Sequence, residues 1–198
     1  VLGQRGAAVV VVEADVDLGA PVMKTLSIFS KGREYDDSFE IELPLDQGGD
    51  FLGQCGATVA EAVTPDPVAI EIWLFDMFTS QDKKRVFITE AGYNDLSIRA
   101  RVEASLDSPA DVVVARNGVK LIVDSDKLRL QGEMKDLQVD ANGRFQSFQM
   151  PIAAWWRKDG AAAAPAPAPM TYAPPPTLSS APSLSSYDNI QFDPPPQA

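Results

Sequence analysis

Few side chains in this 198-residue chain are of a type that could carry out catalysis. Histidine is absent, and with it the commonest general base, proton shuttle and metal ligand. Cys55 is the only cysteine, which excludes an internal disulfide and a multi-cysteine metal site. Because no activating base lies near it in the sequence, we predict that Cys55 is a small core residue rather than a nucleophile.

Carboxylates are the remaining groups that could act as acids, bases or metal ligands. Glu71, Asp76 and Glu90 could supply the pair that a glycosidase needs, but acidic side chains on solvated strand faces explain the same pattern. Residues 124–126 and 140–143 offer oxygen ligands of the kind that Ca²⁺ prefers, without the full binding loop. Turn formation explains both segments. We therefore predict no enzymatic activity, no bound metal and no cofactor.

The 28 acidic residues outnumber the 17 basic ones and give a net charge of −11. Such a surface repels phosphate backbones, so nucleic acid is not an expected partner. The charge either keeps the protein soluble or complements a basic surface on another protein. The apolar run at residues 7–12 is too short to cross a bilayer, and we expect any membrane association to come from an anchor upstream of Val1 or from partners.

Apolar residues alternate with polar ones through most of residues 7–157, which is typical of β-strands. Residues 39–43 predict a strand with one buried and one solvated face. Residues 68–75 are apolar on both sides apart from Glu71, as expected for a central strand covered on both faces, and residues 86–88 predict a neighbour. The fold class is therefore all-β, an antiparallel β-sandwich or a related barrel over residues 21–159, preceded by a strand or lead-in at residues 1–20.

Turn and cap residues refine this fold. Asn117-Gly118 and Asn142-Gly143 each separate two strand-like segments, and Asn-Gly predicts type I′ hairpin turns. Pro151 predicts an edge or a bulge in the last strand. Residues 96–104 alternate like a strand, but Tyr93-Asn94-Asp95 offers a helix cap and favours a short helix at residues 94–103.

Residues 160–198 form a different region, rich in proline, alanine and serine, and ten of the 16 prolines lie there. Because proline fixes φ and restricts the residue before it, we expect an extended, partly polyproline II arm. Proline also reduces the entropy lost on ordering, so the arm suits a tether whose apolar side chains dock on another protein. The expected anchors are Tyr172, Leu178, Leu184, Tyr187, Ile190 and Phe192.

The three tryptophans complete the candidate residues. Trp73 lies in an apolar strand, and we predict that it is core. Trp155 and Trp156 point to opposite faces of a regular strand, so one should be buried and the other exposed. An exposed Trp155 could contact a protein, anchor at a membrane interface, stack on a sugar together with Tyr93, or pack against the base of the arm.

Four stretches of the sequence resemble a poorly characterised bacterial β domain of membrane-anchored proteins, in which the domain follows a transmembrane segment. They are residues 35–42, 51–56, 72–76 and 93–95, and the resemblance covers about residues 30–157. It implies membrane association, a short helix opened at residues 93–95, and no catalytic set. The proline-rich arm is not part of it.

These observations lead to two expected functions. The first is a non-enzymatic accessory or structural subunit of a larger, membrane-associated assembly, in which the arm tethers the domain to partner chains. The alternative is a small-ligand module of the carbohydrate-binding type, built around Trp155.

Overall fold

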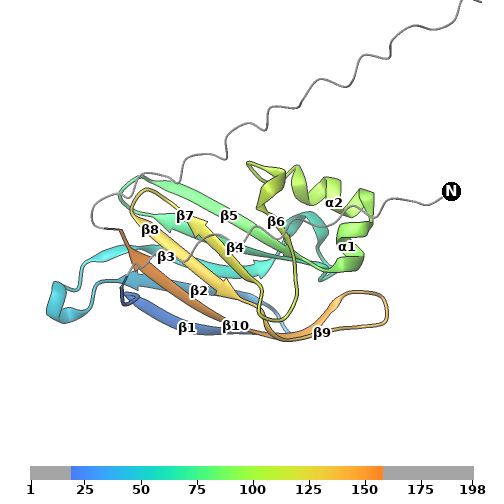
Figure 1. The fold of residues 1–198 in the computed structure, drawn as a ribbon, viewed down its shortest axis with the longest axis horizontal. Helices are drawn as coiled ribbons and strands as arrows, with labels where there is room; N and C mark the ends of the chain where they lie inside the picture. Colours follow the sequence, from blue (N-terminus) through green and yellow to red (C-terminus); the bar gives the residue numbers. More distant parts are fainter. Residues whose placement is uncertain (1–18, 158–198) are drawn as a thin grey trace, which may run out of the picture. The chain divides into compact units, whose positions relative to one another are not determined.

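In a computed structural model of the protein, residues 19–157 are described, and they form ten strands in two sheets that face each other (Figure 1). Sheet A has the order β1-β10-β8-β7, with β9 also paired to β10, and sheet B has the order β2-β3-β4-β5-β6. All pairings are antiparallel except that of β5 with β6. The strands of sheet A are β1 (Met23–Ser30), β7 (Lys120–Asp124), β8 (Leu128–Glu133), β9 (Lys135–Val139) and β10 (Phe145–Trp156). Those of sheet B are β2 (Asp36–Glu42), β3 (Phe51–Val59), β4 (Ala69–Asp76), β5 (Gln81–Ile88) and β6 (Val112–Val114).

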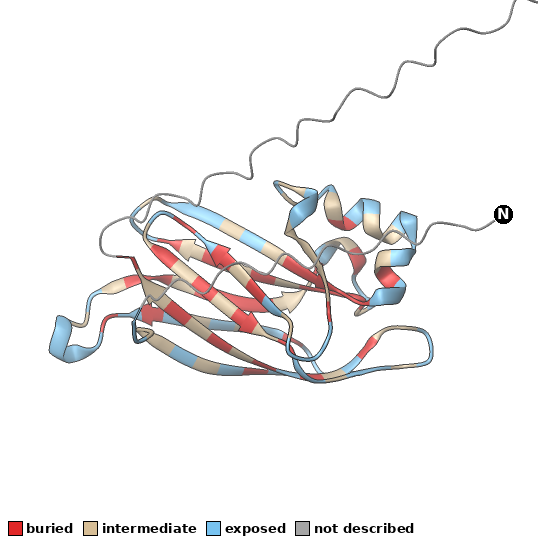
Figure 2. Cartoon of the chain, viewed as in Figure 1, coloured by how far each residue is buried: buried red, intermediate tan, exposed pale blue. Residues whose placement is uncertain are grey.

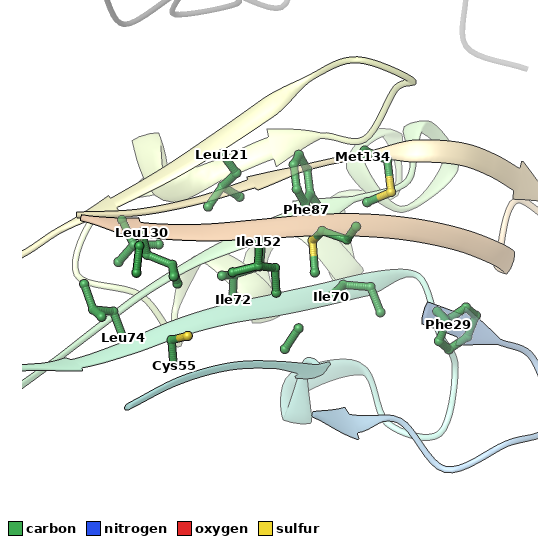
Figure 3. Close-up of a cluster of buried hydrophobic side chains, with 14 of the residues drawn as sticks. Phe29, Cys55, Ile70, Ile72, Leu74, Phe87, Leu121, Leu130, Met134 and Ile152 are labelled. Atoms are coloured by element: carbon green, nitrogen blue, oxygen red, sulfur yellow. The ribbon is translucent and has the colours of Figure 1, made fainter. Parts of the chain in front are cut away.

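The main core lies between the two sheets, and it confirms the predicted all-β sandwich. Buried and exposed residues alternate along the strands in Figure 2, as period-two patterning requires. Side chains from both sheets fill the space between them, including Ile72 of β4 and Ile152 of β10 (Figure 3). Cys55 of β3 is fully buried in this core, as predicted, and burial raises the pKa of its thiol to about 12.

Two short helices cover one end of the outer face of sheet B (Figure 1). They are α1 (Glu90–Asn94) and α2 (Leu96–Glu103), and α2 confirms the helix predicted near residues 94–103. The Asp95 side chain accepts hydrogen bonds from the amides of Ser97 and Ile98, so the N-cap is the last residue of the predicted cap segment at residues 93–95. Val102 of α2 is buried with Ala69, Val86 and Ile88 in a second, smaller core.

Within residues 19–157, the helical layer therefore covers the outer face of the central strand β4 only near the beginning of the strand. Ala69 is buried under the helices, whereas Glu71, Trp73 and Phe75 remain half-buried further along. The prediction that Trp73 is core is wrong, because Trp73 lies on the outer face of sheet B. The apolar run from residue 68 to residue 75 could not reveal how far the helical layer extends over the strand.

The Asn117-Gly118 turn connects two sheets, so the predicted hairpin is wrong. The preceding strand β6 pairs with β5 in sheet B, whereas the following strand β7 pairs with β8 in sheet A. The Val119 amide donates to the Arg116 carbonyl, and Gly118 has a φ of +80°. Asn117 does not have a positive φ, so the turn has the features of type II rather than type I′. The Leu137 amide, 20 residues further along the chain, donates a hydrogen bond of 2.8 Å to Asn117 Oδ1 and stabilises this turn.

The hairpin predicted at Asn142-Gly143 is confirmed, with a different turn. β9 and β10 pair on either side of it, and the Gly143 amide donates to the Asp140 carbonyl. Only Gly143 has a positive φ, +74°, which matches a type I turn followed by a glycine bulge. The Asp140 carboxylate accepts the amides of Asn142 and Arg144 and so stabilises this turn over type I′.

Pro151 lies in β10, which is an interior strand between β1 and β8, so the edge alternative of the prediction is wrong. The bulge alternative is displaced, because the register shifts of β10 lie before Pro151, at residues 145–149. β10 pairs with β8 from Ile152 onward and with β9 up to Gln149, so Pro151 lies where β10 changes partner. The missing amide of proline therefore interrupts no continuous ladder.

Candidate interaction surface

The largest solvent-facing apolar side chains on sheet A come from its edge strand, β1. Odd-numbered residues of β1 face the core, because Phe29 stacks on Phe148 with ring centroids 5.1 Å apart. Leu26 and Ile28 face outward and are 47% and 57% exposed. Burying such side chains would be favourable by roughly 1.5–3 kcal/mol each, so their exposure needs an explanation.

Strand β10 extends this apolar face. In the antiparallel pairing Leu26 lies opposite Pro151, and the outward positions that follow along β10 are Ala153 and Trp155. All three β10 residues are half-buried. We call this set of five residues, Leu26, Ile28, Pro151, Ala153 and Trp155, the apolar strip. The pairing of residues about 125 positions apart creates the strip, so no local pattern in the sequence predicts it.

Trp155 lies at the end of the apolar strip, where residues 19–22 lead into β1. Its indole Nε1 donates a hydrogen bond to the Gly19 carbonyl at 3.1 Å. Trp156 points the other way and packs against the main core, so the prediction that the two indoles face opposite sides of the sheet is confirmed. The prediction of one buried and one exposed indole is wrong, because both are half-buried.

A buried polar chain holds β1 against sheet B beneath the strip. Ser27 Oγ lies 2.7 Å from the Tyr35 hydroxyl and donates to Asp37 Oδ2 at 2.6 Å. The Tyr35 ring packs edge-to-face on Phe29. Burial raises the pKa of Tyr35 above its usual value, so the phenol stays protonated at neutral pH and can donate in this chain. The strip therefore rests on a fixed support.

The structure does not bring the candidate acids together. Asp76 is fully buried, and its carboxylate accepts the Ser125 hydroxyl at 2.5 Å and the amides of Phe78 and Lys127. Glu71 lies on the opposite face of the same strand and pairs with Lys84 at 3.2 Å. Glu90 is an exposed residue in the first turn of α1. Within residues 19–157 these carboxylates hold the fold together or face solvent, and they do not line one cleft.

In the two loops considered as calcium sites, the aspartate carboxylates accept hydrogen bonds from other groups of the protein. Asp124 receives two hydrogen bonds from Arg129, at 2.7 and 2.6 Å, and Arg157 lies 3.5 Å away. Asp140 accepts Lys31 Nζ at 2.6 Å, and this bond, with the amides of Arg144 and Asn142, lowers the pKa of Asp140 to about 2. Across residues 19–157 no group of three or more potential metal-ligating side chains occurs.

A second aromatic surface on sheet B was not predicted from the sequence. Trp73 pairs in register with Gly56, and a Cβ at Gly56 would lie 2.6–2.7 Å from the indole ring. The ring therefore lies against the glycine backbone, and Phe75 follows on the same outer face. The signal that could have revealed this surface is the glycine inside a strand, which often marks a close approach of another group.

The other predicted binding residues are not brought together. Tyr93 packs with the helical layer on sheet B, 4.5 Å below the Arg99 guanidinium, so it does not share a surface with Trp155 on sheet A. The six predicted anchors of the arm, with the arm itself and most of the lead-in at residues 1–20, lie outside the described residues. None of the helices within residues 19–157 has the length and apolar character needed to span a bilayer.

Comparisons of the chain with protein-family models, with curated proteins and with solved structures gave no match.

Proposed function

We propose that this protein is a non-enzymatic accessory subunit of a larger, membrane-associated assembly, in which the sandwich is a rigid body and the arm at residues 160–198 tethers it to partner chains. The observation that supports it best is the apolar strip on sheet A. Leu26 and Ile28 are large and exposed on this face, and Leu26 lies opposite Pro151, which is followed on the same face of β10 by Ala153 and Trp155. Contiguous apolar surface that remains outside the core is typical of contact sites between proteins.

The rigidity of the sandwich also supports a structural role. Arg85 of β5 donates to the Ile122 carbonyl of β7 at 2.7 Å and to the Ala110 carbonyl at 3.1 Å, which joins the two sheets on one side. The Ser27–Tyr35–Asp37 chain joins them on the other side. A body fixed at both sides can present the strip without reorganisation, which reduces the entropic cost of binding.

Sedimentation of the native complex tests this function. The intact chain, a chain lacking residues 161–198 and a Leu26→Asp variant are expressed in the source cells, and solubilised membranes are separated by size. We expect the arm deletion and Leu26→Asp each to move the protein from a large complex toward its own size. Leu96→Asp is the matched control, because Leu96 is 77% exposed on α2, away from sheet A. If both altered chains sediment with the complex as the intact chain does, the proposal fails.

A carbohydrate-binding function is the second candidate, supported by Trp73 and Phe75 rather than by Trp155 with Tyr93. The Trp73 indole lies against the Gly56 backbone and is only half-buried, so part of its ring can stack on a sugar, and the Glu71–Lys84 pair beside it supplies polar groups. Titration with soluble oligosaccharides, followed by tryptophan fluorescence, tests it. Binding should disappear in Trp73→Ala and persist in Trp155→Ala; an unchanged response in Trp73→Ala would rule this site out.

A further inference from the structure

Five of the described strands have a single partner each, and they differ in how they are protected against pairing with another chain. β2 carries four carboxylates among its seven residues, β6 has only three residues, and β7 and β9 have five each, with two charged residues at the start of β9. The Arg85 side chain also donates a hydrogen bond to the backbone carbonyl of Ile122 in β7. Charges, short length and covering side chains are the usual ways in which proteins prevent unwanted pairing at a sheet edge.

Strand β1 has little of this protection. It is eight residues long, Lys24 is its only charged residue, and among the described strands only β10 pairs with it. Its outward side chains include the exposed Leu26 and Ile28. A long, apolar edge of this kind is a template for a further strand.

The hydrogen-bond pattern shows which backbone groups of β1 face the open edge. The Lys31 amide donates to the Gln146 carbonyl in continuation of the β1–β10 pairing. Bonded pairs alternate in an antiparallel ladder, so the odd-numbered residues of β1 bond to β10. The N–H and C=O groups of Lys24, Leu26 and Ile28 therefore point away from β10.

We infer that β1 accepts an extended segment of a partner protein, added antiparallel to its open edge and alternating apolar with basic side chains. This inference rests on the proposed function and specifies the partner. The apolar side chains of the added strand would continue the apolar strip beyond Leu26 and Ile28. The alternate side chains would point toward the edge of sheet B, where β2 lies beside β1 through the Ser27–Asp37 contact.

Charge determines the basic character of the partner. β2 contributes Asp36, Asp37, Glu40 and Glu42 and no basic side chain. In the adjoining turn Lys31 is paired with Asp140, and the opposite charges of Arg33 and Glu34 offset each other. A second copy of this chain, docked edge to edge, would bring two such acidic strands near each other. Like charges placed opposite each other are destabilising, whereas lysine or arginine on the added strand would be attracted.

A nine-residue synthetic peptide that alternates lysine and valine, with blocked ends, tests the inference on the full chain. We expect titration to shift the backbone amide signals of Leu26 and Ile28, and raising the salt concentration to weaken binding. A peptide with glutamate in place of lysine should bind at least about tenfold more weakly. In antiparallel addition the valine amides face β1, so methylating them should abolish binding, whereas methylating the lysine amides should not.

Substitutions at Ile28 provide the matching test on the protein. Ile28→Pro removes an N–H that points to the open edge and no bond to β10, so it should weaken peptide binding at least about tenfold. Ile28→Lys, the second variant in case proline disturbs folding, should do the same by repelling the basic peptide. Leu96→Lys is the control and should bind normally. Thermal unfolding verifies that each variant is folded.

Three results would overturn strand addition at β1. They are an absence of binding by the lysine–valine peptide, binding that Ile28→Pro and Ile28→Lys both leave unchanged, and a chain that sediments as a dimer which Ile28→Pro converts to monomer. The third result would show that a second copy of this chain, rather than a partner protein, pairs with the open edge of β1. The accessory role is judged separately, because Leu26→Asp and the arm deletion can still release the protein from its native complex when the peptide does not bind.

Discussion

At the scale of single residues, the polar groups of this protein are used to fix loops and join the sheets. Asp76, Asp124 and Asp140 each accept hydrogen bonds from loop amides, hydroxyls or basic side chains. Within residues 19–157 the buried thiol of Cys55 has an apolar environment, and burial disfavours its reactive thiolate form.

Asp140 gives a pH-dependent prediction. Its pKa in the folded protein is about 2, below the ordinary 3.8, chiefly because Lys31 donates to it. A lowered pKa stabilises the fold above the unfolded value, and this contribution is lost as the pH falls from about 4 to about 2. In Lys31→Ala the Asp140 carboxyl should titrate closer to 3.8, as measured by NMR. A titration identical to that of the wild type would show that Lys31 is not the cause.

Gly56 gives a prediction about packing. A Cβ at this position would lie 2.1 Å from the Asp37 carbonyl and 2.6 Å from the Trp73 ring, so the backbone itself would have to move. Gly56→Ala should lower the free energy of unfolding by about 1–3 kcal/mol in chemical denaturation. Ser38→Ala, at the exposed position paired with Gly56, is the control and should change it by less than about 0.5 kcal/mol.

At the scale of elements, nearby residues determine where helix caps and turns form, and long-range contacts then influence the type of turn. Asp95 begins α2 through its own side chain, as its position in the sequence indicates. Asn117-Gly118 also forms a turn where the sequence indicates one, but the bond from the Leu137 amide helps select its type. The position of a turn can therefore be predicted from the sequence more readily than the type of turn.

The cap at Asp95 provides a test at this scale. Asp95→Ala removes the acceptor for two amides and should destabilise the protein by about 1 kcal/mol in chemical denaturation. Asp95→Asn keeps a side-chain oxygen and should restore most of the loss. If alanine and asparagine behave alike, the cap does not contribute to stability in the way we describe.

At the scale of the whole molecule, residues 19–157 contain a complete sandwich with two cores of their own. The aromatic cluster of Phe29, Tyr35, Phe145 and Phe148 ties the first strand of the sandwich to the last. We therefore expect residues 161–198 to contribute little to the stability of this sandwich.

Removing residues 161–198 should therefore leave thermal unfolding almost unchanged, with a midpoint within about 2 °C of that of the intact chain, which corresponds to less than about 1 kcal/mol. Differential scanning calorimetry measures this shift. A larger fall in the midpoint would mean that the arm contributes to the stability of its own subunit, which would weaken its proposed role as a tether to other chains.

The sequence by itself determined the features that depend on near neighbours. Period-two alternation predicted the strands, and Tyr93-Asn94-Asp95 predicted a helix cap before α2, because backbone conformation and side-chain direction repeat locally. The lack of an activating base near Cys55 in the sequence predicted that this residue belongs to the core. The absence of histidine also limits the chemistry that the chain can perform in any fold.

Only the tertiary structure decided which strands pair and which faces remain uncovered. The separation of β6 from β7 into different sheets, the position of Trp73 on the outer face of sheet B and the meeting of Leu26 with Pro151 all depend on contacts between distant parts of the chain. Such contacts carry no periodic signal in a single sequence. The apolar strip and the open edge of β1, on which the proposed function depends, exist for that reason only in the folded protein.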